Sequence, residues 1–155
     1  MISIIICTRE ISQLDGIEKN ISNTIGVEFE TVIIDNSKSQ YSLFQAYNIG
    51  VQKSRFSVIC FMHDDIVYHS NDWGLEVIEY FKPPETGMIG IGGTRFLSSI
   101  PTIWWAGGHK YLNSRFGTVC HNSIDTNRNN RTESKYNLIN PEDGNCTKVA
   151  VLDGL

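Results

Sequence analysis

The side chains best suited to chemistry follow an apolar stretch near the middle of the sequence. Residues 57–62 are mostly β-branched, aromatic or sulfur-containing, and His63, Asp64 and Asp65 come directly after them. Such a run predicts a buried strand, and ligands of open α/β sheets bind where the strands end. Because carboxylates are costly to bury without a partner, packing does not explain two in succession. We therefore expect this cluster to face a divalent cation and phosphate.

Two further polar clusters end apolar runs in the same way. Thr8-Arg9 follows residues 2–7, and Asp35-Asn36-Ser37 follows residues 29–34. Neighbouring parallel strands would bring the three clusters to one crevice. No glycine-rich phosphate loop follows the first run, so phosphate must be neutralised another way. Mn²⁺ or Mg²⁺, which needs only one or two carboxylates beside phosphate oxygens, is the alternative that the sequence favours.

Helical patterns separate these strands. Ser12 with Asp15 predicts a capping box for the first helix, and Asp72 is placed to cap the third. Residues 88–93 predict a fourth strand. This alternation implies crossover connections and a largely parallel sheet. The apolar positions recur at helical spacing as Leu14, Ile17, Ile21 and Ile25, then Leu43, Ala46, Tyr47, Gly50 and Val51, then Trp73, Val77, Tyr80 and Phe81.

The pattern weakens after about residue 97. Residues 97–145 predict loops and short strands, and we expect residues 125–134 to be mobile without a ligand. Residues 148–152 resume a strand, after which the chain stops. An α/β domain that ends on a strand, with no closing helix, is expected to be truncated at its C-terminus.

Composition narrows the class of protein. A chain of 155 residues predicts one domain, and 41% apolar with 19% charged residues is typical of a globular protein. The net charge of −4 argues against nucleic-acid binding. The four cysteines have no CxxC spacing, and no run approaches the roughly 18 apolar residues of a membrane span. We expect a cytoplasmic protein without an integral membrane segment, either free or peripheral at the inner membrane face.

Four motifs, taken in order and spacing, resemble the GT-A glycosyltransferases of the family 2 type. The resemblance implies a Rossmann-like three-layer α/β fold with a mostly parallel sheet. It also implies a nucleotide-diphosphate sugar as donor, with a UDP-sugar favoured, and an unidentified glycan or lipid-linked acceptor. The motifs are Ile5-Ile6-Cys7-Thr8-Arg9, Val32-Ile33-Ile34-Asp35-Asn36-Ser37, Ala46-Tyr47-Asn48-Ile49-Gly50 and Phe61-Met62-His63-Asp64-Asp65, with a further match at Val151-Leu152-Asp153-Gly154.

Roles for single residues follow from this resemblance. Thr8 and Asp35 would line the base pocket, and Asp65 would bind Mn²⁺ or Mg²⁺ as the last residue of an Asp-x-Asp-like motif. His63 replaces the first Asp of that motif, which keeps a hydrogen-bonding group and removes a charge, as in a glycosyltransferase-like subgroup. The expected nucleotide-sugar site is Thr8, Arg9, Asp35, Asn36, His63 and Asp64.

The acceptor side is less defined. Residues 1–97 would be the nucleotide-sugar-binding half of a single domain and residues 98–155 a partial acceptor-side region. Trp104, Trp105 and Asp153 are the acceptor candidates, because aromatic faces pack on sugars. In the resembled family the general base lies beyond the position of Asp153, so the catalytic residue is unknown. The remaining candidates for a base are Glu133, Glu142, Asp143 and Asp153.

Simpler interpretations stay open. Asp35 could serve only as a turn residue, and the cluster at residues 63–65 could be a solvated loop. A truncated homologue could bind a nucleotide or carbohydrate without turnover. A nucleotidyltransferase is a second rival, although its glycine-rich basic loop is absent after the first strand. Asp65→Asn with a nucleotide sugar, and the products formed from a nucleoside triphosphate, would separate these alternatives.

Overall fold

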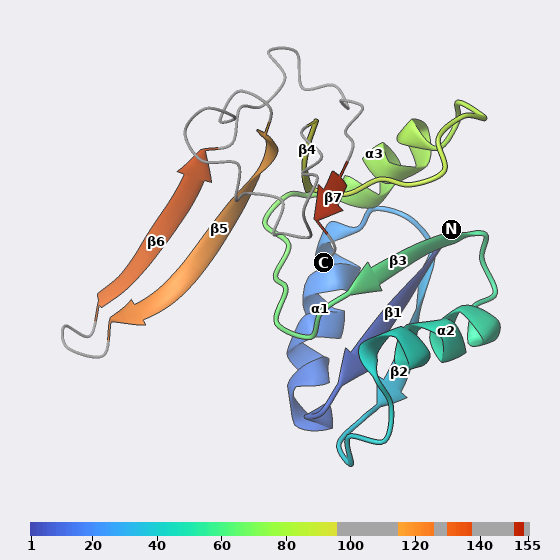
Figure 1. Cartoon of the computed structure of the whole chain (residues 1–155), viewed down its shortest axis with the longest axis horizontal. Coiled ribbons are helices and arrows are strands. Elements are labelled where there is room, and N and C mark those ends of the chain that lie inside the picture. The colour runs from blue at the N-terminus through green and yellow to red at the C-terminus, as the bar shows by residue number, and fades with distance from the viewer. Residues whose placement is uncertain (96–114, 126–129, 138–150, 154–155) are drawn as a thin grey trace. The chain divides into compact units, whose positions relative to one another are not determined.

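The chain forms two compact units, residues 1–87 and residues 88–154, and the first is built around three parallel strands. The computed structural model describes residues 1–95, 115–125, 130–137 and 151–153. The strands of the first unit are β1 (Ile2–Thr8), β2 (Phe29–Asp35) and β3 (Val58–Met62), in the order β2-β1-β3 (Figure 1). The predicted parallel α/β sheet is therefore confirmed.

The strand register brings the three strand ends to one edge. Thr8 of β1 lies opposite Asp35 of β2, and Ile6 of β1 lies opposite Met62 of β3. Because the strands are parallel, the polar residues that follow them leave the sheet on the same side. This arrangement is the one that the sequence predicted.

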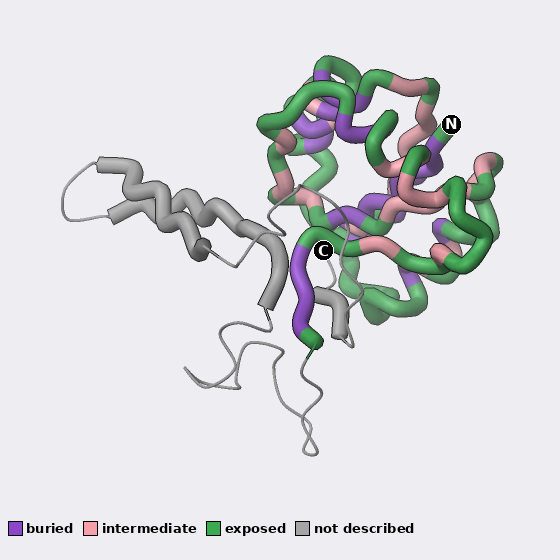
Figure 2. The backbone as a smooth tube through the Cα atoms, turned by 90° about the horizontal axis from the view of Figure 1, so that it is seen from above, coloured by how far each residue is buried: buried purple, intermediate pink, exposed green. Residues whose placement is uncertain are grey.

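Helices cover both faces of this sheet. The 3₁₀ turn η1 (Ile11–Gln13) leads into α1 (Leu14–Thr24), followed by α2 (Leu43–Lys53) and α3 (Trp73–Tyr80). Successive strand side chains point to opposite faces, so Ile4 packs with residues of α1 and Trp73, whereas Ile5 packs with Ala46 of α2. These are the three layers that the resemblance implies, and Figure 2 shows the buried stretches inside the unit.

The second unit contains an antiparallel sheet. Its strands are β4 (Gly92–Thr94), β5 (Arg115–Asp125), β6 (Asn130–Asn137) and β7 (Val151–Asp153), in the order β6-β5-β4-β7. The prediction that residues 88–93 add a fourth strand to the parallel sheet is wrong. Only the end of this segment, Gly92-Gly93, pairs, and it lies antiparallel between β5 and β7, a pairing with distant segments that a local apolar pattern does not reveal.

The β5–β6 ribbon was also predicted poorly. The sequence predicted loops and short strands here, but β5 has 11 residues and β6 has 8. Asp125 is the last residue of β5 and Asn130 the first of β6, in a region where a loop was expected. Polar residues dominate both strands, so neither shows the alternation by which a half-buried strand is recognised. The division of the domain at residue 97, and the mobility expected near residue 125, stay predictions.

Of the two expected helix caps, one is wrong and the other is correct in position only. Ser12 and Asp15 form no capping box, because η1 precedes α1 and places Gln13 at its N-cap without a side-chain cap. Asp72 occupies the N-cap of α3 in a left-handed conformation, and its side chain caps no N–H. The capping box lies instead at α2, where Ser42 and Gln45 bond reciprocally.

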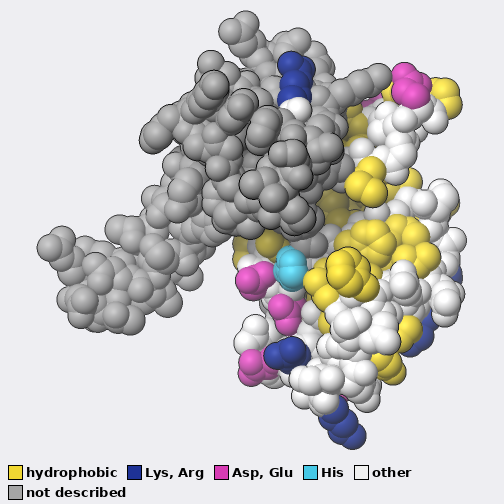
Figure 3. Space-filling model, in the orientation of Figure 1, with side chains coloured by type: hydrophobic (Ala, Val, Ile, Leu, Met, Phe, Trp, Pro, Cys, Tyr) yellow, Lys and Arg dark blue, Asp and Glu magenta, His cyan; other side chains and the backbone are white. Residues whose placement is uncertain are grey.

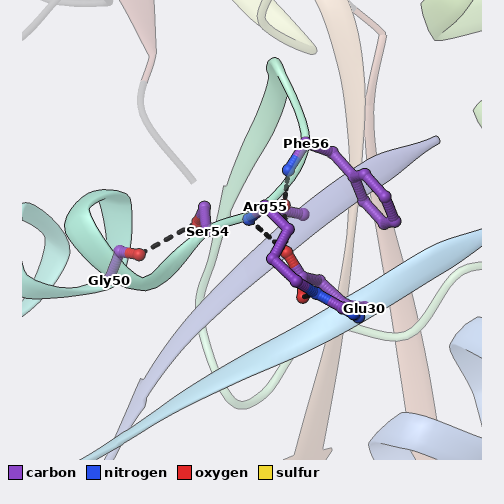
Figure 4. A network of polar contacts seen from close by, with 6 residues as sticks. Glu30, Gly50, Ser54, Arg55 and Phe56 are labelled. Atoms are coloured by element: carbon purple, nitrogen blue, oxygen red, sulfur yellow. Dashed lines mark hydrogen bonds and ion pairs between the residues drawn. The ribbon is translucent and has the colours of Figure 1, made fainter.

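A half-buried carboxylate joins the amino ends of β1 and β2 to the segment that precedes β3 (Figure 4). Glu30 accepts hydrogen bonds from the Ser3 hydroxyl and from the N–H and Nε of Arg55, each at 2.6 Å. The Ser3 hydroxyl in turn accepts the N–H of Phe56 at 3.1 Å. The bond from Ser3, followed by those from Arg55, lowers the pKa of Glu30 from 4.5 to about 2.

This depressed pKa predicts a specific loss of stability in acid. Since the carboxyl ionises more readily in the folded state, its contribution is complete above pH 4.5 and is lost as the pH falls towards about 2. We expect Glu30→Gln to lower the free energy of unfolding at neutral pH and to flatten its decline across this window. Denaturant titrations at several pH values test this. The exposed control Glu85→Gln should follow the wild type, and a Glu30→Gln curve parallel to the wild type would contradict the assignment.

Two helical glycines predict opposite effects of the same substitution. A Cβ on Gly50 of α2 would clash with the side chain of the fully buried Ile5, whereas a Cβ on Gly16 of α1 would meet open space. We expect Gly50→Ala to destabilise the fold by about 1–3 kcal/mol through overpacking. Gly16→Ala should stabilise it by up to about 1 kcal/mol through helix propensity. Equal effects in thermal unfolding would show that α2 does not approach β1 this closely.

Candidate nucleotide-binding site

A pocket of about 320 Å³ opens at the carboxyl ends of the parallel strands. Each of the three strand ends contributes to it, and so does the beginning of α2. Three predicted site residues, Arg9, Asn36 and Asp64, meet there. The complete lining is Cys7, Arg9, Asn36, Tyr41, Ser42, Leu43 and Asp64.

At the end of β1, Thr8 holds the turn that presents Arg9. Thr8 is buried, and its hydroxyl accepts the N–H of Glu10 at 2.9 Å. Its carbonyl accepts the N–H of Asn36 at 2.8 Å, which extends the pairing of β1 and β2 by one residue. Arg9 is exposed and reaches the pocket. The structure therefore places Thr8 beneath the site and Arg9 on it.

At the end of β2, Asn36 fixes the loop that leads to α2. Its amide donates to the carbonyl of Tyr41 at 2.9 Å, and its carbonyl accepts the N–H of Tyr41 at 3.0 Å. Asp35 is exposed and accepts the N–H of Ser37 at 2.9 Å, a bond that lowers the pKa of the carboxyl. The turn interpretation of Asp35 is thus compatible with a ligand at the same carboxylate.

At the end of β3, Asp64 and its neighbours differ in exposure. Asp64 is half-buried and lines the pocket, whereas His63 and Asp65 are exposed and lie outside the lining. Acidic and basic side chains gather with a histidine on the face shown in Figure 3. The Tyr47 hydroxyl donates to the carbonyl of Met62 at 3.4 Å, just before this cluster.

The negative charge of Asp64 affects the pKa values of two nearby groups, Tyr47 and Cys7. Burial, with smaller contributions that include Asp64, raises the pKa of Tyr47 to about 12. Burial also raises the pKa of the Cys7 thiol, and the nearby Asp64 adds to that rise. Both groups are therefore neutral near pH 7, so Arg9 and Asp64 are the charged side chains of the pocket lining.

The oxygen-rich side chains suit a hard cation. Mg²⁺ and Mn²⁺ bind through one or two carboxylates together with phosphate oxygens and water, and adjacent Asp64 and Asp65 offer such donors. Among the residues that the structure describes, no three His, Cys, Asp or Glu side chains form a ready metal cage. The donor set fits a cation that takes further ligands from a bound diphosphate.

Other predicted residues belong to the second unit or lie outside the described residues. Glu133 is on β6 and Asp153 on β7, where it pairs with Gly92. Trp104, Trp105, Glu142 and Asp143 lie outside the described residues. No helix within the described ranges is long and apolar enough to cross a membrane.

Sequence reasoning missed part of the lining. Tyr41, Ser42 and Leu43 border the pocket because the loop after β2 returns α2 to the same sheet edge. The signal for this return was the Ser42–Gln45 capping box, which marks where α2 begins. Cys7 also lines the pocket, and its place at the end of an apolar run gives no signal of this.

Comparison with known proteins gives one finding. Neither the curated proteins nor the solved structures contain a significant match. A family model described as "Glycosyltransferase like family" matches residues 3–155, almost the entire chain. The resemblance seen in the motifs thus extends beyond them, and it agrees with a parallel sheet between helical layers of the Rossmann-like GT-A type. The protein belongs to this glycosyltransferase-like family.

Proposed function

We propose that this domain binds a nucleotide-diphosphate sugar, with a UDP-sugar favoured, together with Mn²⁺ or Mg²⁺, and that it transfers the sugar to a glycan or lipid-linked acceptor. The observation that supports this most directly is the meeting of Arg9, Asn36 and Asp64 in one pocket at the carboxyl edge of the sheet. Family membership supports the reaction class.

The charges of the pocket suit such a donor. Within residues 1–95, Arg9 and Asp64 line the same pocket without forming an ion pair with each other. In the proposal, Arg9 contacts the diphosphate, Asp35 the base, and His63 and Asp64 the ribose side. Asp65 holds the cation, which when bound would stabilise negative charge on the leaving diphosphate.

Nucleotide binding is the first prediction. A ligand at about 100 times its Kd adds about 2.7 kcal/mol to the free energy of unfolding, which corresponds to a rise in Tm of about 5–10 °C. We expect this rise with UDP and Mn²⁺, and a smaller one with UDP and EDTA. UMP with Mn²⁺ is the matched control, because it lacks the second phosphate. If no nucleoside diphosphate in a panel raises the Tm under either condition, the donor site is wrong.

Substitution of the two aspartates should separate their roles. We expect Asp65→Asn to remove the gain in UDP affinity that Mn²⁺ provides, a loss of about tenfold or about 1.4 kcal/mol. Asp64→Asn should weaken UDP binding in EDTA as well, because Asp64 lines the pocket itself. Isothermal titration calorimetry measures both effects. Asp15→Asn, an exposed change in the first turn of α1, should behave as the wild type. Retention of the full Mn²⁺ gain in Asp65→Asn would refute its assignment as the cation ligand.

Turnover distinguishes transfer from binding alone. In the same preparations, release of UDP from a UDP-sugar would support a glycosyltransferase, and Asp65→Asn should abolish it. Binding without release, across a panel of sugars and acceptors, would instead support a binding module derived from such an enzyme.

A further inference from the structure

The segment with the acidic residues is held at both ends. Before it, the carbonyl of Met62 accepts the hydroxyl of Tyr47 on α2 at 3.4 Å. After it, the backbone of Tyr68 is bonded by Asn20 on α1. Residues 63–67 therefore connect two fixed points, one on β3 and one against α1. The contact between Asn20 and Tyr68 is not part of the proposed donor site.

Asn20 bonds both backbone groups of Tyr68. Its amide nitrogen donates to the carbonyl of Tyr68 at 3.0 Å, and its amide oxygen accepts the N–H of Tyr68 at 2.8 Å. An asparagine offers a donor and an acceptor on one short side chain, so it can replace the pairing that a neighbouring strand would give. Asn20 is half-buried on α1, far from Tyr68 in the sequence.

The ring of Tyr68 is fixed from the same helix. It stacks on the ring of Trp73, with centroids 4.1 Å apart and planes inclined by 10°. The Trp73 indole donates to the Thr24 hydroxyl at 3.1 Å, and that hydroxyl lies 2.8 Å from the carbonyl of Asn20. Adjacent turns of α1 thus hold both the backbone and the side chain of Tyr68.

We propose that Asn20 is a positioning residue for the carboxylates of Asp64 and Asp65. This inference rests on the proposed function. Only Ile66 and Val67 separate Asp65 from the anchored Tyr68, so a shift of Tyr68 passes directly to the acidic turn. Loss of a group that bonds a metal-ligating side chain typically weakens metal binding about 10–100-fold, and Asn20 would act one step further out, through the backbone, so the lower end of this range is expected.

The test compares three variants by calorimetry with UDP in Mn²⁺ and in EDTA. Asn20→Ala removes both bonds to Tyr68. We expect the gain in UDP affinity from Mn²⁺ to fall by about tenfold, while the affinity in EDTA is retained. Asn20→Asp keeps the acceptor for the N–H of Tyr68 but turns a carboxylate oxygen toward the carbonyl of Tyr68, so it should lose at least as much of the Mn²⁺ gain as Asn20→Ala. Asn23→Ala, the same change at an exposed position of α1, should match the wild type.

The readouts distinguish positioning from simple stapling of the fold. Loss of the two bonds between Asn20 and Tyr68 lowers the Tm in either case, so the Tm alone does not discriminate between the two roles. A full Mn²⁺ gain in Asn20→Ala, or an equal loss in Mn²⁺ and EDTA, would overturn the positioning role while the donor site stands. Absence of UDP binding by the wild type would overturn both proposals. Should Asn20→Ala fail to fold, Asn20→Asp decides by the same comparison.

Discussion

The parallel pairing of β1 with both of its neighbours is the constraint on which the site depends. Residues 2–6 of β1 are completely buried, since helices cover both faces of the sheet. A slip of one residue would turn Ile5 away from the space left by Gly50 and break the bond between Ser3 and Glu30, so these contacts fix the register. With the register fixed, Thr8 lies opposite Asp35 and the end of β3 lies beside them. The pocket is a consequence of this alignment.

Charged side chains have different partners at the two ends of the sheet. At the amino end, Glu30 is surrounded by donors from Ser3 and Arg55, so its charge is satisfied within the fold. At the carboxyl end, Arg9 and Asp64 face one pocket and form no ion pair with each other within residues 1–95. A charge that the fold satisfies contributes to stability, whereas charges directed into a pocket can bind a ligand.

Local patterns in the sequence predicted the parts that depend on local burial. The three apolar strands and the polar residues after them were placed correctly, because continuous apolar runs mark strands buried on both faces. Arg9, Asn36 and Asp64 were brought together by that reasoning. The antiparallel sheet was not predicted, since the pairing of β4 with β5 and β7 depends on contacts between distant segments. The capping box expected at Ser12 failed because one extra turn, η1, shifted the start of α1, whereas Asp72 lies at the expected N-cap but its left-handed backbone goes with a side chain that caps no N–H.

Some of the polar residues at the strand ends shape turns, and some line the pocket. Asn36 was expected to bind the donor, yet both ends of its amide bond the backbone of Tyr41. Thr8 likewise supports a turn from a buried position. Residue type alone does not reveal this division, because the same side chains suit either task. It follows from backbone geometry: Thr8 and Asn36 bond the backbone of their own turns, and Asn36 lines the pocket as well, whereas the longer side chain of Arg9, one residue beyond Thr8, lines the pocket from an exposed position.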